Sequence, residues 1–293
     1  MPSQSPPLEP KRTTLKDWLE EALPRLQSVS QTPLLDAQVL LAHVLRKPRS
    51  WVLAHPEVHL SCEQQDHLDE ALRRLVQGEP LPYLIGHWEF YGLDFLLTPA
   101  TLIPRPETET LVEQALLWLH DHPAKRLAID VGSGSGCIAV TLAVKVPDLY
   151  VIASDLSFEA LEVVRQNALR HGVDDRVHYA QADLLTAFGV RFDLICANLP
   201  YIPSDALRHL PIYGKEPTLA LDGGTGGLTT IRQLLQQAVH CLTEDGLLLV
   251  EIEASQGEAV YALAEQTFPT SELRILPDLA GRDRLLRLQR KGG

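Results

Sequence analysis

The segment LAIDVGSGSGCIAV, residues 127–140, decides the fold. It begins with an apolar run that is typical of a buried strand and continues through three glycines to the apolar start of a helix. Glycines let a backbone approach a ligand closely, and a helix N-terminus presents free N–H groups. The segment therefore predicts a strand, a ligand-binding turn and a helix.

The alternation of strand and helix continues after this segment. Strands are predicted at 127–131, 150–154, 177–181, 192–197 and 246–252, and helices at 136–146, 157–171, 226–242 and 256–267. A terminal hairpin, 273–276 with 284–288, would add antiparallel strands. This pattern predicts an α/β fold, a Rossmann-like sheet of seven strands covered by helices on both faces.

The chain before this domain has a different character. We expect a flexible tail at 1–12, a small helical bundle at 13–80, a β-hairpin linker at 81–104 with its turn near Tyr91-Gly92, and the α/β domain at 105–293. In the bundle, Thr14 is predicted to cap a helix that Pro24 interrupts. Ser61 with Gln64 forms a predicted capping box for a helix that ends before Gly78. Another helix is expected at 36–45, and one from about 107 to 120 opens the α/β domain.

Composition and charge disfavour several functional classes. The 293 residues carry a formal net charge of −12, which disfavours general phosphate binding and stable association with nucleic acid. The four cysteines are far apart and are interpreted as small buried residues of a reduced compartment, and no ligand spacing predicts a metal. Because no apolar run of 18 residues and no signal peptide is found, we expect a cytoplasmic protein without membrane contact, and a monomer.

The glycine turn favours one cofactor over another. The third glycine, Gly136, comes one residue too early for the dinucleotide pattern, whereas GxGxG after an acidic residue is the commoner form in S-adenosylmethionine (SAM) methyltransferases. Asp155 ends the next strand, where a carboxylate can accept both ribose hydroxyl hydrogens. Asp183 follows the third strand and is predicted to reach the adenine amino group, with Leu184 packed on the ring. The alternative for each acid is a helix cap or a turn residue.

A second motif, Asn198-Leu199-Pro200-Tyr201, follows an apolar strand and so lies at the carboxyl end of the sheet, where ligands bind in open α/β folds. An amide nitrogen is a poor nucleophile because its lone pair is delocalised. The Asn198 side-chain oxygen and the Leu199 carbonyl can accept its hydrogens and orient it, and Tyr201 can stack on the planar group. The alternative is an ordinary Asn-x-Pro turn.

These motifs together resemble the HemK/PrmC family, the N5-glutamine methyltransferases of peptide chain release factors, over nearly the whole chain. The resemblance is carried by IPRPETE at 103–109, VGSGSG at 131–136, SDLS at 154–157, NLPY at 198–201, EP at 216–217, ALDGG at 220–224, GL at 227–228 and GRDR at 281–284.

The resemblance implies a role for each motif. The expected SAM-binding residues are Gly132, Ser133, Gly134, Ser135, Gly136, Asp155, Asp183, Leu184 and Asn198. The expected catalytic and substrate-binding residues are Asn198, Leu199, Pro200 and Tyr201, with Arg105 and Glu107 at the mouth of the site. The implied substrate is the glutamine of the Gly-Gly-Gln loop in class-I release factors, and the helical bundle would dock the body of the release factor.

The chain departs from the family at two positions. Leu199 replaces the first proline of Asn-Pro-Pro-Tyr, and the resulting Asn-Leu-Pro-Tyr resembles ribosomal RNA adenine dimethyltransferases. Glu253 replaces a glycine. Adenine N6 methylation of RNA or DNA is therefore an alternative function, although no basic stripe supports it. A SAM-binding module without turnover is a third possibility, which the intact Asn198 and glycine turn disfavour.

Overall fold

The computed structural model describes residues 13–291, so the predicted tail at 1–12 lies outside the described residues. The chain divides into two compact units between Ile85 and Gly86. Within residues 13–291, no helix has the length and apolar character that crossing a membrane requires.

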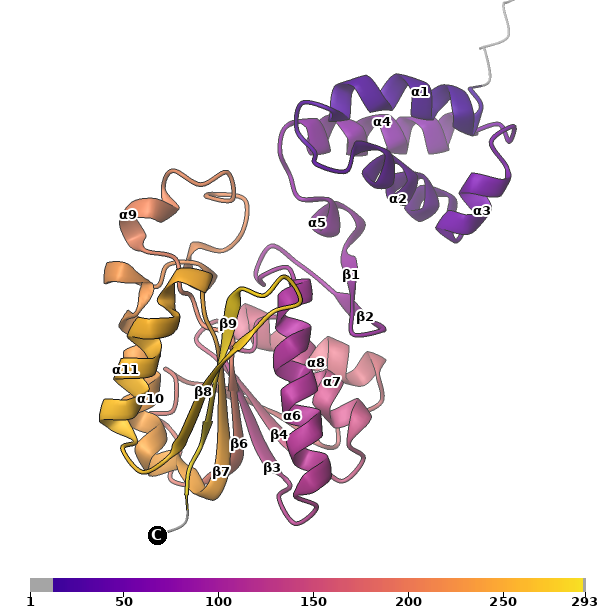
Figure 1. Cartoon of the computed structure of the whole chain (residues 1–293). Helices are drawn as coiled ribbons and strands as arrows, with labels where there is room; N and C mark the ends of the chain where they lie inside the picture. Colours follow the sequence, from indigo (N-terminus) through magenta and orange to yellow (C-terminus); the bar gives the residue numbers. More distant parts are fainter. Residues whose placement is uncertain (1–12, 292–293) are drawn as a thin grey trace, which may run out of the picture. The chain divides into compact units, whose positions relative to one another are not determined.

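The N-terminal unit consists of helices, as expected (Figure 1). Both predicted caps are present as complete capping boxes, Thr14 with Asp17 and Ser61 with Gln64. The helices are α1 (Leu15–Leu26), α2 (Pro33–Leu45), α3 (Arg49–Ala54), α4 (Cys62–Val76) and α5 (Leu81–Ile85).

Three local predictions were wrong here. Pro24 lies exposed in the last turn and does not interrupt α1. Its missing N–H removes one backbone hydrogen bond, and Leu26 beyond it is fully buried. α2 begins at Pro33 rather than at residue 36, since proline suits the first turn of a helix. Cys62 is exposed, whereas the other three cysteines are buried. The sequence also did not predict α3 or α5, and α5 lies in the segment expected to be the linker.

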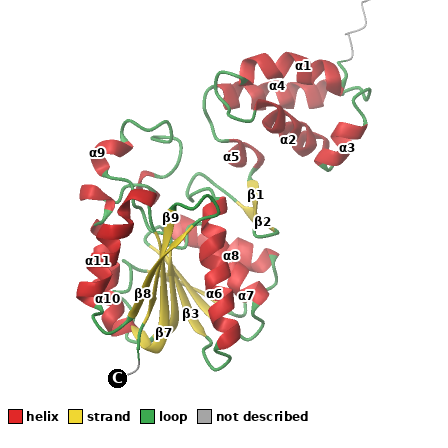
Figure 2. Cartoon of the chain, in the orientation of Figure 1, coloured by secondary structure: helices red, strands yellow, loops and turns green. Residues whose placement is uncertain are grey.

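The second unit is built on a seven-stranded sheet, and the predicted fold class is confirmed (Figure 2). Its strand order is β5-β4-β3-β6-β7-β9-β8; β3 to β7 run parallel, and β9 is antiparallel to both β7 and β8. The strands are β3 (Leu127–Val131), β4 (Tyr150–Asp155), β5 (Val177–Gln181), β6 (Phe192–Ala197), β7 (Leu242–Glu251), β8 (Glu272–Pro277) and β9 (Asp283–Gln289).

Successive strand residues point to opposite sides of the sheet, and the residues on both sides are apolar. Both faces are therefore covered by helices. Ala128 packs into a core with α6 (Glu109–Asp121), α7 (Cys137–Lys145) and α8 (Phe158–Arg170), and Ile129 packs into a second core with α10 (Thr229–Cys241) and α11 (Gly257–Thr267). The short hairpin β1 (His87–Phe90) and β2 (Leu93–Leu96) turns at Tyr91-Gly92 as predicted. The remaining pieces are η1 (Pro106–Thr108), α9 (Ser204–Leu207), η2 (Thr218–Ala220), η3 (Thr225–Gly227) and η4 (Ala254–Gln256).

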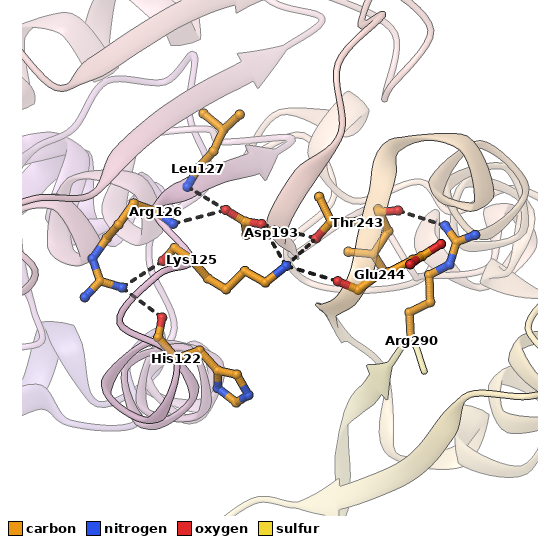
Figure 3. Close-up of polar contacts among 9 residues, drawn as sticks. His122, Lys125, Arg126, Leu127, Asp193, Thr243, Glu244 and Arg290 are labelled. Atoms are coloured by element: carbon orange, nitrogen blue, oxygen red, sulfur yellow. Dashed lines mark hydrogen bonds and ion pairs between the residues drawn. The ribbon is translucent and has the colours of Figure 1, made fainter. Parts of the chain in front are cut away.

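A polar cluster ties together the starting ends of β3, β6 and β7 (Figure 3). The Asp193 carboxylate accepts hydrogen bonds from the backbone N–H groups of Arg126, at 3.0 Å, and Leu127, at 3.2 Å. It also accepts the Thr243 hydroxyl, at 3.2 Å, and pairs with Lys125, at 3.3 Å. These contacts fix the strand starts, so the register that pairs Val131 with Ala197 is held from this end.

Candidate active site

The turn after β3 has the backbone conformation that only glycine adopts freely. Gly132, Gly134 and Gly136 have φ values of 70°, 54° and 77°. A Cβ on Gly136 would lie 2.7 Å from the Val164 Cγ1, so the turn packs directly on α8. The sequence therefore needs glycine here for both conformation and space.

Asp155 holds this turn against the end of β4. One carboxylate oxygen accepts the Gly134 N–H at 2.9 Å, and the other accepts the Ser157 N–H at 2.9 Å. Burial raises the pKa of Asp155, and the backbone donors oppose that shift. The turn and the acid at the end of the next strand, which were predicted separately, thus form one unit.

A cavity of about 380 Å³ opens beside the turn. The Ser133 hydroxyl is buried in its wall and has no hydrogen-bond partner within residues 13–291. Of the predicted site residues, the cavity is lined by Gly132, Ser133, Gly134, Ser135, Asp155, Asp183, Leu184, Asn198, Leu199 and Pro200. The structure therefore brings most of the predicted residues together around one space. Gly136, Tyr201, Arg105 and Glu107 do not line it.

The Asn198 carboxamide lies at the end of β6 and is oriented by a buried relay. Its Nδ2 donates to the Thr108 hydroxyl at 3.0 Å, and that hydroxyl donates to Glu251 at 2.7 Å. The Tyr201 hydroxyl approaches the second oxygen of Glu251 at 3.4 Å. Within the part of the chain that the structure describes, the Asn198 Oδ1 has no donor, so it is available to accept hydrogens from a ligand.

Burial is the main influence on the ionisation of Glu251, the carboxyl group at the end of this relay. Glu251 is 1 % exposed, and burial raises its pKa to about 7, against the lowering effects of the Thr108 hydroxyl, Arg284 and the Tyr201 hydroxyl. Burial and, next, the Glu251 carboxylate raise the pKa of Tyr201. The phenol therefore stays protonated near neutral pH and acts as a hydrogen-bond donor.

The loop 198–201 is held firmly without a second proline. Thr230 Oγ1 donates to the Pro200 carbonyl at 2.9 Å, and Gln256 Nε2 donates to the Tyr201 carbonyl at 2.9 Å. The Leu199 side chain is 3 % exposed and packs on Gly132. Among the described residues no hydrogen bond reaches the Leu199 carbonyl. Packing of the Leu199 side chain and these side-chain hydrogen bonds thus restrain the loop.

Arg105 and Glu107 lie outside the cavity wall. Arg105 forms a 2.5 Å ion pair with Glu216, whose second oxygen accepts the Ile103 N–H at 3.1 Å. Glu216 is buried, so this pair ties the segment before η1 to the loop before η2. Glu107 is exposed.

Sequence reasoning missed the residues that support the site. Thr108 and Glu216 lie in quoted motifs without a role of their own, and Glu251 and Gln256 were not singled out. The one signal for Glu251 was a carboxylate ending an otherwise apolar strand, LLLVE at 247–251. Glu253, the departure from the family, caps η4 by accepting the Ser255 N–H at 2.8 Å.

The fold and the cavity assign the protein to a class, the methyltransferases with the fold of SAM-dependent enzymes. Residues 110–209 match the model of the methyltransferase small domain. Two solved structures share the fold. A methyltransferase from Pyrococcus furiosus has a TM-score of 0.51 and 16% identity, and the match covers 80% of this chain and all of that one. The hMettl16 catalytic domain in complex with the MAT2A 3'UTR hairpin 6 has a TM-score of 0.52 and 14% identity, and the match covers 77% of this chain and 82% of that one.

Sequence relatives narrow the class to one family. Residues 17–86 match the model of the PrmC N-terminal domain. The release factor glutamine methyltransferase of Moorella thermoacetica is 43% identical over 92% of this chain and 96% of its own, and that of Escherichia coli is 40% identical over 83% and 87%. The chain belongs to the release factor glutamine methyltransferase family, and the resemblance predicted from its motifs is confirmed.

Proposed function

We propose that this protein transfers a methyl group from SAM to the side-chain amide nitrogen (N5) of the glutamine in the Gly-Gly-Gln motif of class-I peptide chain release factors. The observation that carries the proposal is the Asn198 carboxamide, whose nitrogen is engaged by Thr108 and whose oxygen is left for a ligand beside the cavity. Membership of the family supports the substrate.

The residues present fit SAM. Gly134, where a Cβ would meet no atom within 4 Å, leaves space for a close backbone approach. Asp155 offers a carboxylate at the end of β4 for ribose hydroxyls. The unpartnered Ser133 hydroxyl and the lining residues Asp183 and Leu184 supply polar and apolar contacts for the rest of the molecule. When bound, SAM supplies an electrophilic methyl group on a sulfonium.

The loop 198–201 would prepare the substrate nitrogen. The Asn198 Oδ1 and the Leu199 carbonyl, both free to accept, would take the two amide hydrogens and so fix the direction of the nitrogen. The nitrogen reacts before it loses a proton, so a general base is not needed and the product releases its proton afterwards. Stacking of Tyr201 on the substrate stays a prediction, because its ring does not line the cavity.

We assign the N-terminal unit to docking of the release factor body. Three leucines on α2 and α3, Leu34, Leu35 and Leu53, are 38 to 52 % exposed. Exposed apolar side chains of this size are suited to a protein partner. The match of residues 17–86 to the PrmC N-terminal domain supports a role specific to this family.

The second candidate is N6 methylation of adenine in nucleic acid. Leu199 favours it, since Asn-Leu-Pro-Tyr resembles the motif of ribosomal RNA adenine dimethyltransferases, whereas the net charge of −12 disfavours it. Incubation with methyl-labelled SAM and either a purified release factor or ribosomal RNA separates the two. We expect label on the release factor alone, and none when its Gly-Gly-Gln glutamine is replaced. Label on the RNA alone would reject the proposal.

A further inference from the structure

The Asn198 carboxamide has two ends of nearly the same shape and opposite hydrogen-bonding character. Only the orientation with the oxygen toward the substrate can accept amide hydrogens. Rotation by half a turn would present two donors to two donors and block the substrate. The site therefore needs a group that distinguishes the two orientations.

The Thr108 hydroxyl touches the carboxamide but cannot choose alone, because a hydroxyl both donates and accepts. Glu251 removes the ambiguity. A carboxylate only accepts, so the hydroxyl proton points to Glu251 at 2.7 Å and the hydroxyl lone pair faces the Asn198 Nδ2 at 3.0 Å. The direction of each hydrogen bond is thus set by the one before it.

We propose that Thr108 and Glu251 are positioning residues, and that the ionised Glu251 carboxylate fixes the Asn198 carboxamide with its oxygen toward the substrate amide. The proposal rests on the proposed function, which gives the free oxygen its use. A protonated Glu251 would instead donate to the Thr108 oxygen. The hydroxyl could then donate to Asn198 Oδ1, which permits the reversed carboxamide.

Burial, together with the charges around Glu251, places this change in an accessible pH range. The groups that face it are Thr108 and Glu107 from η1, Tyr201 from the loop after β6, Arg284 from β9 and Cys137 from α7. Arg284 lowers the pKa of Glu251 and Glu107 raises it, while burial, the largest effect, brings it to about 7. Since the carboxylate is the active form, turnover should fall as the pH falls through this value.

A matched pair of variants tests the role of the hydroxyl. Thr108→Val keeps the shape and removes the hydroxyl, whereas Thr108→Ser keeps the hydroxyl. We expect Thr108→Val to lower kcat at least tenfold while the Kd for SAM changes less than twofold, and Thr108→Ser to recover most of kcat. A valine variant with normal kcat, or a serine variant as slow as the valine one, overturns the proposal.

A second measurement needs no substrate. The chain contains two asparagines, Asn167 and Asn198, so protein labelled with ¹⁵N-asparagine gives two side-chain NH₂ signals in an NMR spectrum. Asn167 is fully buried, with its Nδ2 bonded to the carbonyls of Leu96 and Ser135, and serves as the internal reference. Asn198→Ala identifies the other signal.

We expect the Asn198 signal to shift in Thr108→Val. In the wild-type protein it should titrate between pH 8 and pH 6, and in Glu251→Gln, which has no proton to gain, it should not. An Asn198 signal that is unchanged in Thr108→Val, or that titrates equally in the wild type and in Glu251→Gln, overturns the proposal. If the signals behave as expected and no release factor is methylated, the proposed function fails and the relay stands.

Discussion

The Leu199 side chain lies against Gly132: its Cδ2 is 3.0 Å from the point where a Cβ on Gly132 would stand. The glycine turn and the loop after β6 are therefore in direct contact, and the hydrophobic core that contains Ile129 and Val131 includes Leu199. A change at Gly132 should affect both sides of the cavity.

Gly132→Ala tests this contact. Its φ of 70° strains any residue with a Cβ, by about 1 kcal/mol or more, and the new methyl group presses on Leu199. We expect the Kd for SAM, measured by calorimetry, to rise about fivefold or more. Gly172→Ala is the control, because its φ of 66° carries the same strain in open space away from the cavity. An equal loss of SAM binding in both variants would contradict a local effect.

Asn198→Ala removes the acceptor from the reaction loop. We expect the Kd for SAM to stay within a few-fold of wild type, while kcat with a release factor falls about 100-fold, the usual scale for loss of one oriented hydrogen-bonding group. The measurement is steady-state methyl transfer alongside calorimetry. Unchanged turnover would refute the assigned role.

Asp155→Ala should weaken SAM binding about tenfold or more. It removes the proposed ribose contact and also the acceptor of the Gly134 and Ser157 N–H groups. The exposed Asp174, which lies in the turn after α8, provides Asp174→Ala as a charge-matched control. If the Kd of the Asp155 variant barely moves, the ribose assignment is wrong.

Asp130 makes the stability of the SAM-free protein depend on pH. Burial raises its pKa from 3.8 to about 7, one oxygen accepts the Ala139 N–H, and the other has no partner among the described residues. The folded state therefore holds a proton that the unfolded state releases, and this contribution to stability is lost as the pH rises from about 4 through 7.

Asp130→Asn should consequently stabilise the protein more at pH 8 than at pH 5, by about 1.4 kcal/mol for each pH unit between pH 5 and the folded-state pKa of about 7. Urea unfolding at both pH values checks this. The same stability difference from wild type at pH 5 and at pH 8 would show that Asp130 does not titrate in this range.

The exposed leucines of the N-terminal unit give a prediction about docking. Leu34→Ser with Leu53→Ser should raise KM for the release factor several-fold and leave kcat at saturation unchanged, because the site is in the other unit. Leu117→Ser, on α6 and 61 % exposed, controls for the loss of a surface leucine. Equal KM values for the double variant and the control would remove the docking role.

Local patterns in the sequence located the fold and much of the candidate site. The apolar runs of β3, β4 and β6 each end beside a polar or glycine residue, so Gly132, Asp155 and Asn198 could be placed at one edge of the sheet from the order of residues alone. Capping boxes at Thr14 and Ser61 were equally local and equally accurate.

The supporting residues could not be found in this way. Thr108 is 143 positions from Glu251, and only folding brings them within 2.7 Å. The prediction that Pro24 interrupts the helix was wrong because it used a local rule alone. Burial of Leu26 in tertiary contacts outweighs the helix-breaking tendency of proline. Spacing along a sequence does not reveal either kind of long-range effect.

The pairing of Val131 with Ala197 has a consequence for how such an enzyme can be altered. The residues that follow this pair, Gly132 and Asn198, begin the two loops that would hold methyl donor and methyl acceptor. The pairing of β3 with β6 sets the distance between Gly132 and Asn198. Changes in surface loops can therefore alter the substrate without changing this distance. Insertion of a single residue into either strand would separate donor from acceptor, whatever side chains surround them.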